Sequence, residues 1–502
     1  MNASHRFLPF LTGILVLSIS AIVFSQYGFE GAITRDTANA LYSGQQMARG
    51  IPPFVSIFNH SGSSGPLLSG IGVWLATVFS LDDILIVRII FFIIGSLAAT
   101  SLYFFTSDLF ESRRIGFLAV FTFLGFGCFG KHTMTGPSGK ISLVLFETLS
   151  LLFMVRKGWF LAGICGSLAF LAWQPAAIYA LVAIILAFAQ SKPGRERILN
   201  IIRTASGAAI PLIAVSLYFL SKSAFYEFID GTILFNLYHL EREPSSIISH
   251  LGAPVMAIFR SYTIMAIPMF LGFLAILIIY VWRLKLCGRS ITRLLSEDRF
   301  APILLSFPAP VIWSVLDFQG CPDLYIFLPY LASGFAWLLY MAFQRLIEVG
   351  EMRHFAQKWS FILLCGTLIA TAATHYKITS EKGLNEQRRW ASEVESRFGS
   401  DSRLVSIGVP EILVLLHRTN PNPYVFIVSG IDNHINAARS DGFDGWLKEL
   451  QDYDPQIIAF GPTRGRFKST LTSWLEFHYS ETNIGDWKLF VRQHTNNITP
   501  VR

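Results

Sequence analysis

The sequence has few charged residues for its length. Asp, Glu, Lys and Arg make up 15% of the 502 residues, whereas 52% are hydrophobic. A soluble globular chain has about 25% charged residues, so this composition argues against a soluble protein. The apolar residues form successive runs of the kind that cross a membrane, where about 18 residues are needed for one span. The sequence therefore predicts an integral membrane protein with many helical spans.

Cysteine is also scarce, and its spacing argues against two kinds of site. The chain has five cysteines, none of them in a C-x-x-C arrangement, so neither a zinc site nor a disulfide framework is expected. Most lie within or beside apolar segments, where cysteine behaves as a small hydrophobic residue. After residue 375 the chain lacks a Gly-rich phosphate loop and a catalytic elbow, and we interpret that part as accessory.

The positive charge indicates membrane topology rather than nucleic-acid binding. The net charge is +7, but the basic residues gather in three stretches between apolar segments, a pattern that places such loops on the cytoplasmic side. The stretches are Lys192, Arg195, Arg197 and Arg203; Arg283, Lys285, Arg289, Arg293 and Arg299; and Arg345, Arg353 and Lys358. We expect a multi-pass protein of the plasma membrane with no nucleic-acid partner. The parts expected outside are residues 25–65, 223–252, 317–323 and the C-terminal part.

Two domains are predicted. Residues 1–375 contain the apolar segments and predict about 11 to 13 transmembrane helices, although short segments leave the number between residues 66 and 190 open. In residues 376–502, strand-like and helix-like stretches alternate, which is typical of a small, mainly parallel α/β domain. Strands are expected at residues 403–409, 424–428, 456–460 and 487–491, and helices at 443–453 and 467–479. The predicted fold class is a mainly α polytopic membrane protein with a small C-terminal α/β domain outside the membrane.

Asp36 is the candidate catalytic residue. It lies in the first outer loop, about a dozen residues after the first apolar segment. A carboxylate at the membrane surface is placed to deprotonate a sugar hydroxyl, because a general base must reach the proton that it removes. The alternative is that Asp36 caps a helix beginning at Thr37, and spacing alone favours the cap.

Five basic side chains are candidates for binding a phosphate headgroup. Lys131, His132 and Lys140 fall in KHTMTGPSGK, between two apolar segments, where lysines either bind phosphate as point charges or snorkel at the interface. His60 lies in the first outer loop and has the alternative of a structural hydrogen bond. Arg260, near the outer start of a span, either holds a lipid phosphate or anchors its helix.

Four polar residues are candidates for lining the cleft or binding the acceptor. Gln174 stands beside Pro175, which interrupts an apolar segment. Asp317, Gln319 and Asp323 fall in DFQGCPDLYIFLPY, an outer turn with two carboxylates and no basic residue. The alternative for this turn is that Asp323 caps the following helix.

These stretches carry a resemblance to a known superfamily. Asp36, then Gly50-Ile51-Pro52-Pro53, Asn59-His60 and Gly65-Pro66 resemble the first extracytoplasmic loop of GT-C glycosyltransferases. The DFQG, TGPSGK and WQPAA stretches resemble dolichyl-phosphate-mannose mannosyltransferase-like proteins. The resemblance implies that Asp36 is the catalytic base and that the donor is a sugar on a polyprenyl phosphate. One departure is that this chain has Ser-Ser-Gly-Pro where members often have Lys-Pro-Pro. A basic residue that contacts the sugar donor is therefore expected elsewhere in the chain.

The expected activity is that of an inverting hexosyltransferase at the extracytoplasmic face. It transfers mannose, or another hexose or pentose, from dolichyl or undecaprenyl phosphate to a glycan, lipid or protein acceptor, with membrane lipid as its surroundings. No cofactor is required, because the lipid phosphate is a good leaving group; a divalent cation, Mg²⁺ or Mn²⁺, on Asp36, Asp317 and Asp323 is left open. The alternatives are a transporter or flippase, which predicts midplane charges and internal repeats, and a receptor with an elaborate outer domain.

Overall fold

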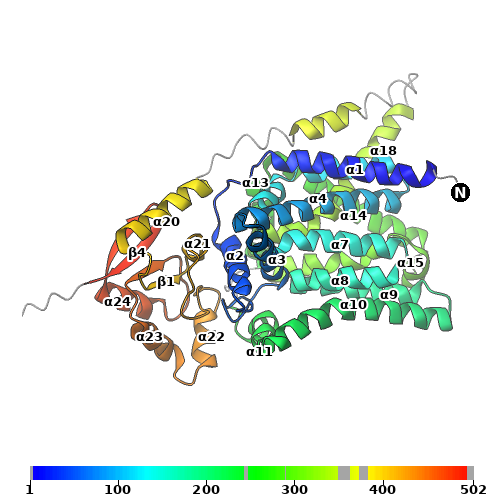
Figure 1. Ribbon diagram of the computed structural model, residues 1–502. Helices are drawn as coiled ribbons and strands as arrows, with labels where there is room; N and C mark the ends of the chain where they lie inside the picture. Colours follow the sequence, from blue (N-terminus) through cyan, green and yellow to red (C-terminus); the bar gives the residue numbers. More distant parts are fainter. Residues whose placement is uncertain (1–3, 242–246, 289, 349–361, 372–382, 494–502) are drawn as a thin grey trace, which may run out of the picture.

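The computed structural model describes residues 4–241, 247–288, 290–348, 362–371 and 383–493. Its helices lie side by side in a bundle, and the C-terminal α/β part is attached at one end of that bundle (Figure 1). The chain is mainly α with one small sheet, as predicted. The α-helices of the membrane part, apart from α4, α5, α6 and α10, which are given in the next paragraph, include α1 (Ser4–Ser25), α2 (Arg35–Ala48), α3 (Ser64–Phe79), α7 (Gly139–Val155), α8 (Trp159–Ala172), α9 (Ala177–Ala189), α11 (Phe225–Ile229), α12 (Phe235–Tyr238), α13 (Ile247–Tyr262), α14 (Ala266–Leu286), α15 (Ile291–Glu297), α16 (Ala301–Ser306), α17 (Pro308–Leu316) and α18 (Leu328–Glu348).

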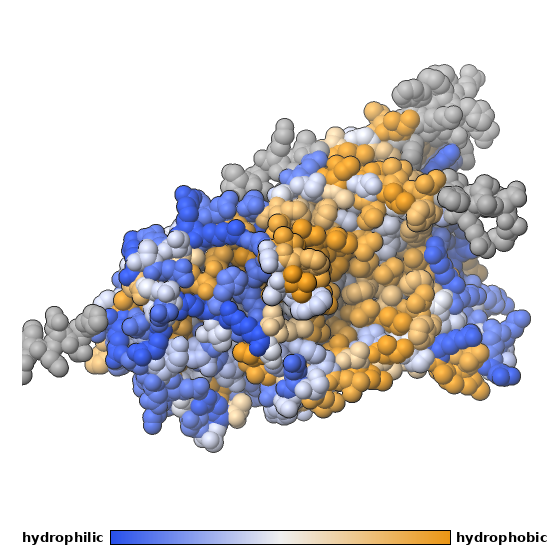
Figure 2. Space-filling model, viewed as in Figure 1, coloured by the Kyte–Doolittle hydropathy of each residue, from blue (hydrophilic) through white to orange (hydrophobic). Residues whose placement is uncertain are grey.

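The bundle has the length and polarity of a membrane protein. Among the described residues, four helical stretches are long and apolar enough to cross a membrane: Asp83–Phe110 (α4), Arg195–Ser221 (α10), Gly252–Leu286 and Cys321–Arg345. A fifth is formed if α5 (Arg113–Leu124) and α6 (Gly127–Thr135), bent by 68°, count as one broken span. An apolar band covers the bundle between more hydrophilic ends (Figure 2). The predicted 11 to 13 spans include shorter apolar helices, and that number stays a prediction.

Small residues let neighbouring helices of the bundle pack backbone to backbone. A Cβ added to Gly163 on α8 would lie 2.2 Å from the Thr204 carbonyl oxygen, and one added to Gly207 on α10 would lie 2.1 Å from the Phe160 oxygen. Lipid tails are as apolar as leucine, so close van der Waals packing rather than the hydrophobic effect drives helices together in a membrane. The glycines on the facing sides of α8 and α10 therefore fix how these two helices pack.

The C-terminal part is built around a four-stranded sheet of order β1-β2-β4-β3. Only β1 and β2 are parallel, whereas β2–β4 and β3–β4 are antiparallel, so the prediction of a mainly parallel sheet was wrong. The strands are β1 (Leu404–Ile407), β2 (Ile457–Phe460), β3 (Tyr479–Ile484) and β4 (Trp487–Arg492). The helices are α20 (Leu384–Phe398), α21 (Pro410–Leu415), α22 (Ile431–Ala438), α23 (Gly442–Tyr453) and α24 (Lys468–His478).

One predicted strand is not formed, and one strand of the structure was not predicted. Residues 424–428 form no strand; the Val425 carbonyl accepts one hydrogen bond from the Gly408 amide at 2.6 Å, but no ladder follows. The apolar run there is buried, and burial alone looks the same in an extended loop and in a strand. β3 was missed because its outward residues are polar, with only Tyr479 and Ile484 buried in it.

The basic stretches and the α/β part lie at opposite ends of the bundle. α15 and the connection between α9 and α10 are both at the end far from the α/β part (Figure 1). These segments belong to the first two basic stretches; in the third, Arg353 and Lys358 lie outside the described residues. The two ends of the bundle therefore differ in character, as the charge pattern predicts.

Candidate functional site

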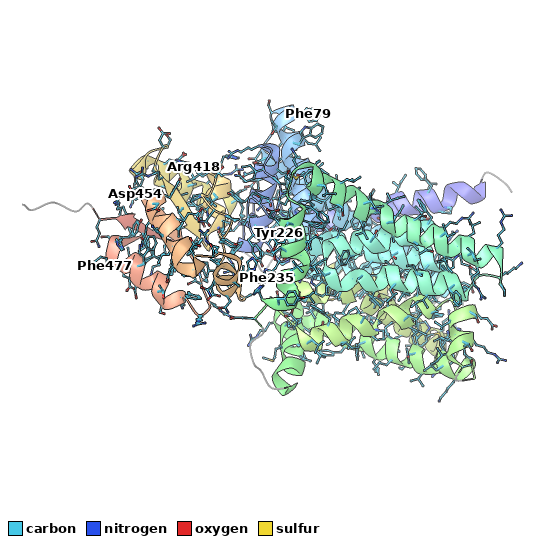
Figure 3. The ribbon with its side chains drawn as sticks, turned by 90° about the horizontal axis from the view of Figure 1, so that it is seen from below. Phe79, Tyr226, Phe235, Arg418, Asp454 and Phe477 are labelled. Carbon is cyan, nitrogen blue, oxygen red and sulfur yellow. A yellow bond between two sulfur atoms is a disulfide. The ribbon has the colours of Figure 1, made fainter. Side chains whose placement is uncertain are left out.

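A cavity of about 1560 Å³ lies where the bundle meets the α/β part. Its walls come from the start of α2, the loop before α3, the start of α7, the turn between α17 and α18, and the C-terminal part. Phe235 and Tyr226 lie at this junction, away from Asp454 and Phe477 in the α/β part (Figure 3). Seven of the ten candidate residues line the cavity: Asp36, His60, His132, Lys140, Asp317, Gln319 and Asp323. The other three, Lys131, Gln174 and Arg260, do not line it.

Asp36 lies in the first turn of α2. The helix begins at Arg35 and is capped by Thr34, whose side chain accepts from the Thr37 amide while the Thr37 hydroxyl accepts from the Thr34 amide. The interpretation of Asp36 as the helix cap was therefore wrong, because the helix starts two residues earlier than expected. A carboxylate in the first turn is favoured by the helix dipole. Asp36 is exposed to the cavity, and its carboxylate is open to a ligand.

Lys140 is a basic side chain of the cavity wall that has three carboxylates near it. It stands in the first turn of α7, where its ammonium forms an ion pair with Asp323 and lies 4.8 Å from the centre of the Trp173 ring. Burial lowers the pKa of Lys140 to about 8, while the nearby charges of Asp36 and Asp317 act in the opposite direction. The lysine is thus held at the cavity wall by a carboxylate and a ring.

The turn between α17 and α18 is closed by its own side chains. Asp323 is 3% exposed, and its carboxylate accepts from the Gln319 backbone amide at 2.6 Å as well as from Lys140. The helical turn begins at Cys321, so Asp323 is not its cap. The Gln319 side chain donates to Asp317 at 3.3 Å. Asp323 therefore orients the turn and Lys140, and Asp317 is the more exposed carboxylate of the pair.

The side chains of the site are not arranged as the ligands of a metal ion. Within the parts of the chain that the structure describes, no group of three or more His, Cys, Asp or Glu side chains is placed to hold a metal ion. The Lys140 ammonium already neutralises Asp323, which would be one of the three ligands considered from the sequence. A cation on Asp36, Asp317 and Asp323 therefore does not fit this arrangement.

His60 and Gln174 are linked through the protein backbone. Burial lowers the pKa of His60, and the charges of Asp317 and Asp36 counter that effect. The His60 backbone carbonyl accepts a hydrogen bond from the side-chain amide of Gln174 at 3.2 Å and another from the side-chain amide of Asn236 at 3.0 Å. Gln174 thus holds the loop that presents His60, instead of lining the cavity itself.

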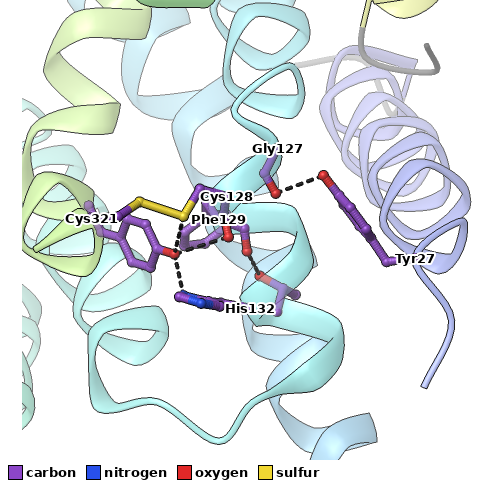
Figure 4. Close-up of a disulfide and its surroundings, with 8 residues drawn as sticks. Tyr27, Gly127, Cys128, Phe129, His132 and Cys321 are labelled. Atoms are coloured by element: carbon purple, nitrogen blue, oxygen red, sulfur yellow. Dashed lines mark hydrogen bonds between the residues drawn. A yellow bond between two sulfur atoms is a disulfide. The ribbon is translucent and has the colours of Figure 1, made fainter. Parts of the chain in front are cut away.

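His132 connects the cavity to a disulfide. Its Nδ1 is hydrogen-bonded to the Tyr325 hydroxyl, which also contacts the Cys128 carbonyl at 3.0 Å (Figure 4). Cys128 is paired with Cys321 in a disulfide, so cysteine cross-linking was wrongly discounted at this pair. The two cysteines are 193 positions apart, and sequence spacing alone has no means of pairing them. The disulfide joins α6 to the turn that contains Asp317.

Glu411 is a cavity residue that the sequence analysis missed. It lies at the start of α21, and its Oε2 is buried without a hydrogen-bond partner in the described parts of the chain. Burial raises the pKa of Glu411 to about 7; Asp36 acts in the same direction and Arg35 opposes it. No local signal marks it, because an acidic residue after a proline is an ordinary helix start. Only the folded chain brings it near Asp36.

Several contacts fasten the α/β part to the loops around the cavity. The Phe58 amide donates to the Pro423 carbonyl at 2.8 Å, and the Phe58 ring stacks on His434 at 4.6 Å between ring centres. His434 in turn lies 3.2 Å from the Asp230 carboxylate. Both side chains of this pair are largely buried, so the junction is a packed interface and not a loose contact.

A helical membrane bundle with a small α/β part at its C-terminal end is consistent with a GT-C fold. Two solved proteins share this fold over nearly all of the chain. ArnT from Cupriavidus metallidurans in the apo state matches with a TM-score of 0.60 and 12% identity, covering 97% of this chain and 98% of ArnT. Its structure bound to undecaprenyl phosphate matches with a TM-score of 0.54 and 11% identity, covering 99% of each chain.

The second solved protein is the archaeal oligosaccharyltransferase AglB from Archaeoglobus fulgidus, in complex with an inhibitory peptide and a dolichol-phosphate. It matches with a TM-score of 0.51 and 13% identity, covering 96% of this chain and 74% of AglB. No family model matches the chain, and neither does any curated protein. At such low identity the likeness establishes the fold, and the chemistry has to be argued from the site.

Proposed function

We propose that the protein is a membrane glycosyltransferase that transfers a sugar from a polyprenyl phosphate to an acceptor hydroxyl or amide, with Asp36 as the general base. The observation that carries this proposal is the exposed carboxylate of Asp36 in a cavity that also contains Lys140 and His60. A base and phosphate-binding groups in one cavity, beside an apolar bundle, are what a lipid-linked sugar donor requires.

The donor class is supported by the ligands of the two solved proteins. ArnT was solved with undecaprenyl phosphate and AglB with a dolichol-phosphate, and we infer a polyprenyl-phosphate sugar for this chain. Lys140, His60 and His132 are assigned to the phosphate. Lys131 and Arg260 lie outside the cavity lining and are assigned no role in the reaction. Asp317 and Gln319 are assigned to hydroxyl groups of the sugar or the acceptor.

The reaction is a single displacement at the anomeric carbon. The acceptor oxygen or nitrogen forms a bond to that carbon while the bond from the carbon to the phosphate oxygen breaks, which inverts the configuration. Asp36 takes the proton of the acceptor, and the polyprenyl phosphate leaves with the bonding electrons. Lys140 stabilises the negative charge that grows on the departing phosphate, because its ammonium is held close to the cavity by Asp323.

The location of the charges distinguishes this proposal from a transporter. A transporter places its functional charges near the bilayer midplane, whereas Asp36, Lys140 and Asp317 lie at the end of the bundle, against the α/β part. Glu147 is an ionisable residue inside the bundle, and its carboxyl group accepts a hydrogen bond from the Tyr179 hydroxyl at 2.7 Å. Tyr179 itself accepts from Tyr330 at 3.0 Å, so Glu147 belongs to a buried hydrogen-bond chain between helices.

The test is a transfer assay with purified protein in proteoliposomes. Radiolabelled mannosyl-, glucosyl- and arabinosyl-phosphate polyprenols are offered to the wild type, to Asp36→Asn and to Asp401→Asn, an exposed carboxylate outside the cavity. We expect the wild type and Asp401→Asn to transfer or hydrolyse one donor equally well. Asp36→Asn should be slower by about 10²- to 10⁴-fold, the usual contribution of general-base catalysis.

Two outcomes contradict the proposal in different ways. Equal rates for wild type and Asp36→Asn remove Asp36 from its role but leave the enzyme class intact. No turnover of any donor, together with specific uptake of a solute into the vesicles, would instead identify a transporter.

A further inference from the structure

The segment that leads into α2 is held from two sides. Residues 29–33, here called the strap, connect α1 to the helix that contains Asp36. One side of the strap faces α4 of the bundle, and the other faces α20 of the C-terminal part. The hydrogen bonds with α4 are made by Phe29 and Gly31, and those with the C-terminal part are made by Glu30 and Ile33.

On the bundle side the strap is held by Arg88. This residue of α4 is fully buried, and its guanidinium donates to the carbonyl oxygens of Phe29 and of Gly31, the second at 2.8 Å. Arginine has five donors in a planar fork and keeps its charge when buried, so it is able to hold two acceptors at once. Burying an arginine is costly without hydrogen bonds; both terminal nitrogens of Arg88 make them to the strap, whereas its Nε has no partner among the described residues.

On the opposite side the strap is held by α20. The Gln387 side chain accepts from the Ile33 amide at 2.7 Å and donates to the Ile33 carbonyl at 2.9 Å. The Leu384 amide donates to the Glu30 carbonyl at 2.8 Å, and Gly31 pairs with Gly383 in an antiparallel bridge. Gln387 is 7% exposed, so both of its bonds are sheltered from water.

The contacts of Arg88 and Gln387 with the strap, here called the clamp, lie close to Asp36 along the chain. Thr34, which caps α2, directly follows Ile33, and Asp36 lies in the first turn after that cap. The position of this turn is therefore set by where Arg88 and Gln387 hold the strap. Gln387 also lines the cavity wall near the same turn.

We propose that Arg88 and Gln387 are positioning residues that hold Asp36 in its reactive place through the strap. This inference rests on the proposed function, in which Asp36 is the base. It gives Gln387 of α20 a positioning role in the reaction, although the sequence of the C-terminal part contains no Gly-rich phosphate loop or catalytic elbow. A displacement of about 1 Å at a reacting group costs roughly 10²-fold in rate, so a modest loosening of the strap is expected to be visible.

Steady-state kinetics of Gln387→Ala provide the first test, with Asn385→Ala as the matched control. Asn385 is an exposed amide on the same helix, two residues earlier. In the donor assay above, Gln387→Ala should lower kcat roughly 10- to 100-fold with little change in the KM for the donor, because the phosphate contacts remain. Asn385→Ala should match the wild type. A kcat for Gln387→Ala close to that of the wild type overturns the proposal.

Hydrogen–deuterium exchange provides a second test that needs no substrate. Gln387→Ala should speed exchange in peptides that cover residues 29–40, while peptides from α23 exchange as in the wild type. Unchanged exchange at residues 29–40 overturns the clamp whatever the activity. If no donor is turned over even by the wild type, the proposed function fails, whereas the exchange result still decides whether α20 holds the strap.

Arg88 is tested by a pair of variants. Arg88→Lys keeps a charged donor and should retain more activity than Arg88→Met, which has none; a general loss of folding would lower both together and would show as a lower unfolding temperature. Equal kcat in Arg88→Met and the wild type contradicts the role assigned to Arg88. The Gln387 variants lie outside the bundle, so the proposal stays testable if Arg88→Met fails to fold.

Discussion

At the scale of single residues, the cavity brings several carboxylates together. Lys140 is already paired with Asp323, and Arg35 lies over the Phe426 ring with 5.6 Å to its centre. Asp36, Asp317 and Glu411 share the same space. Burial raises the pKa of Glu411 to about 7, and the nearby charge of Asp36 acts in the same direction, because both disfavour the ionised carboxylate.

A stability measurement checks this state of Glu411. Its folded pKa lies above the ordinary value of about 4.3, so between that value and about 7 the unfolded chain releases its proton first and stability falls as the pH rises. Glu411→Gln removes this dependence. In detergent, the unfolding midpoint of the variant should exceed that of the wild type above pH 7, and the two should converge near pH 4.5.

The control for this measurement is Glu395→Gln, an exposed carboxyl on α20. Its midpoint should follow that of the wild type at every pH. A Glu411→Gln variant whose midpoint runs parallel to the wild type across the whole range would show that Glu411 ionises normally in the folded protein.

At the scale of elements, the strap passes α6 with no spare room. A Cβ on Gly31 would lie 2.4 Å from Thr135 Cγ2 but 3.5 Å from Thr135 Cβ. Gly31→Ala should therefore displace the strap and lower kcat by about 10-fold or more. Adding Thr135→Ala deletes the clashing methyl group, so the double variant should recover most of the lost activity in the same transfer assay.

Gly252→Ala is the comparison for the Gly31 series. Among the residues that the structure describes, a Cβ there has no neighbour within 4 Å, so this variant should behave as the wild type does. If Gly31→Ala is fully active, or if Thr135→Ala gives no recovery, the close approach of the strap to α6 does not control the site.

Elements marked by a local pattern were predictable from the sequence, and those that depend on distant partners were not. The first outer loop and the KHTMTGPSGK and DFQGCPDLYIFLPY stretches contain the seven candidate residues that line the cavity, because each is a polar stretch between apolar ones. β3 was missed, since its exposed Ser480 and Glu481 look like surface loop. Gln387 was missed for a different reason: its partners, the amide and carbonyl of Ile33, are backbone groups of a segment far away in the chain.

At the scale of the whole molecule, the cavity exists only because the two ends of the chain meet. Its walls reach from the first loop to β4, and the His434–Asp230 contact at 3.2 Å holds the C-terminal part against the bundle. The segment-by-segment pattern predicted that outer loops and the C-terminal part share one side. How closely they pack depends on tertiary contacts for which the sequence offers no periodic signal.

The basic end of the bundle defines a prediction about orientation. Basic loops stay in the cytoplasm, so the cavity and the α/β part are expected outside. Two cysteines report this when placed in a chain from which Cys165, Cys287 and Cys365 have been removed. Phe477 on α24 is 78% exposed, and Ile291 on α15 is 63% exposed; Phe477 lies in the α/β part, and α15 lies at the basic end (Figures 1 and 3).

In intact cells, a membrane-impermeant maleimide should label Phe477→Cys at once and Ile291→Cys only after the membrane is permeabilised. We expect this pattern because basic loops are not moved across the membrane during insertion, which fixes the orientation of the chain. The expectation does not depend on any property of the cavity. Labelling of the chain without Cys165, Cys287 and Cys365, in which only the disulfide-bonded Cys128 and Cys321 remain, sets the background. The reverse pattern would place Asp36 on the cytoplasmic side, where it would face a different supply of lipid-linked sugars, and would require the positive stretches to be explained as a binding surface.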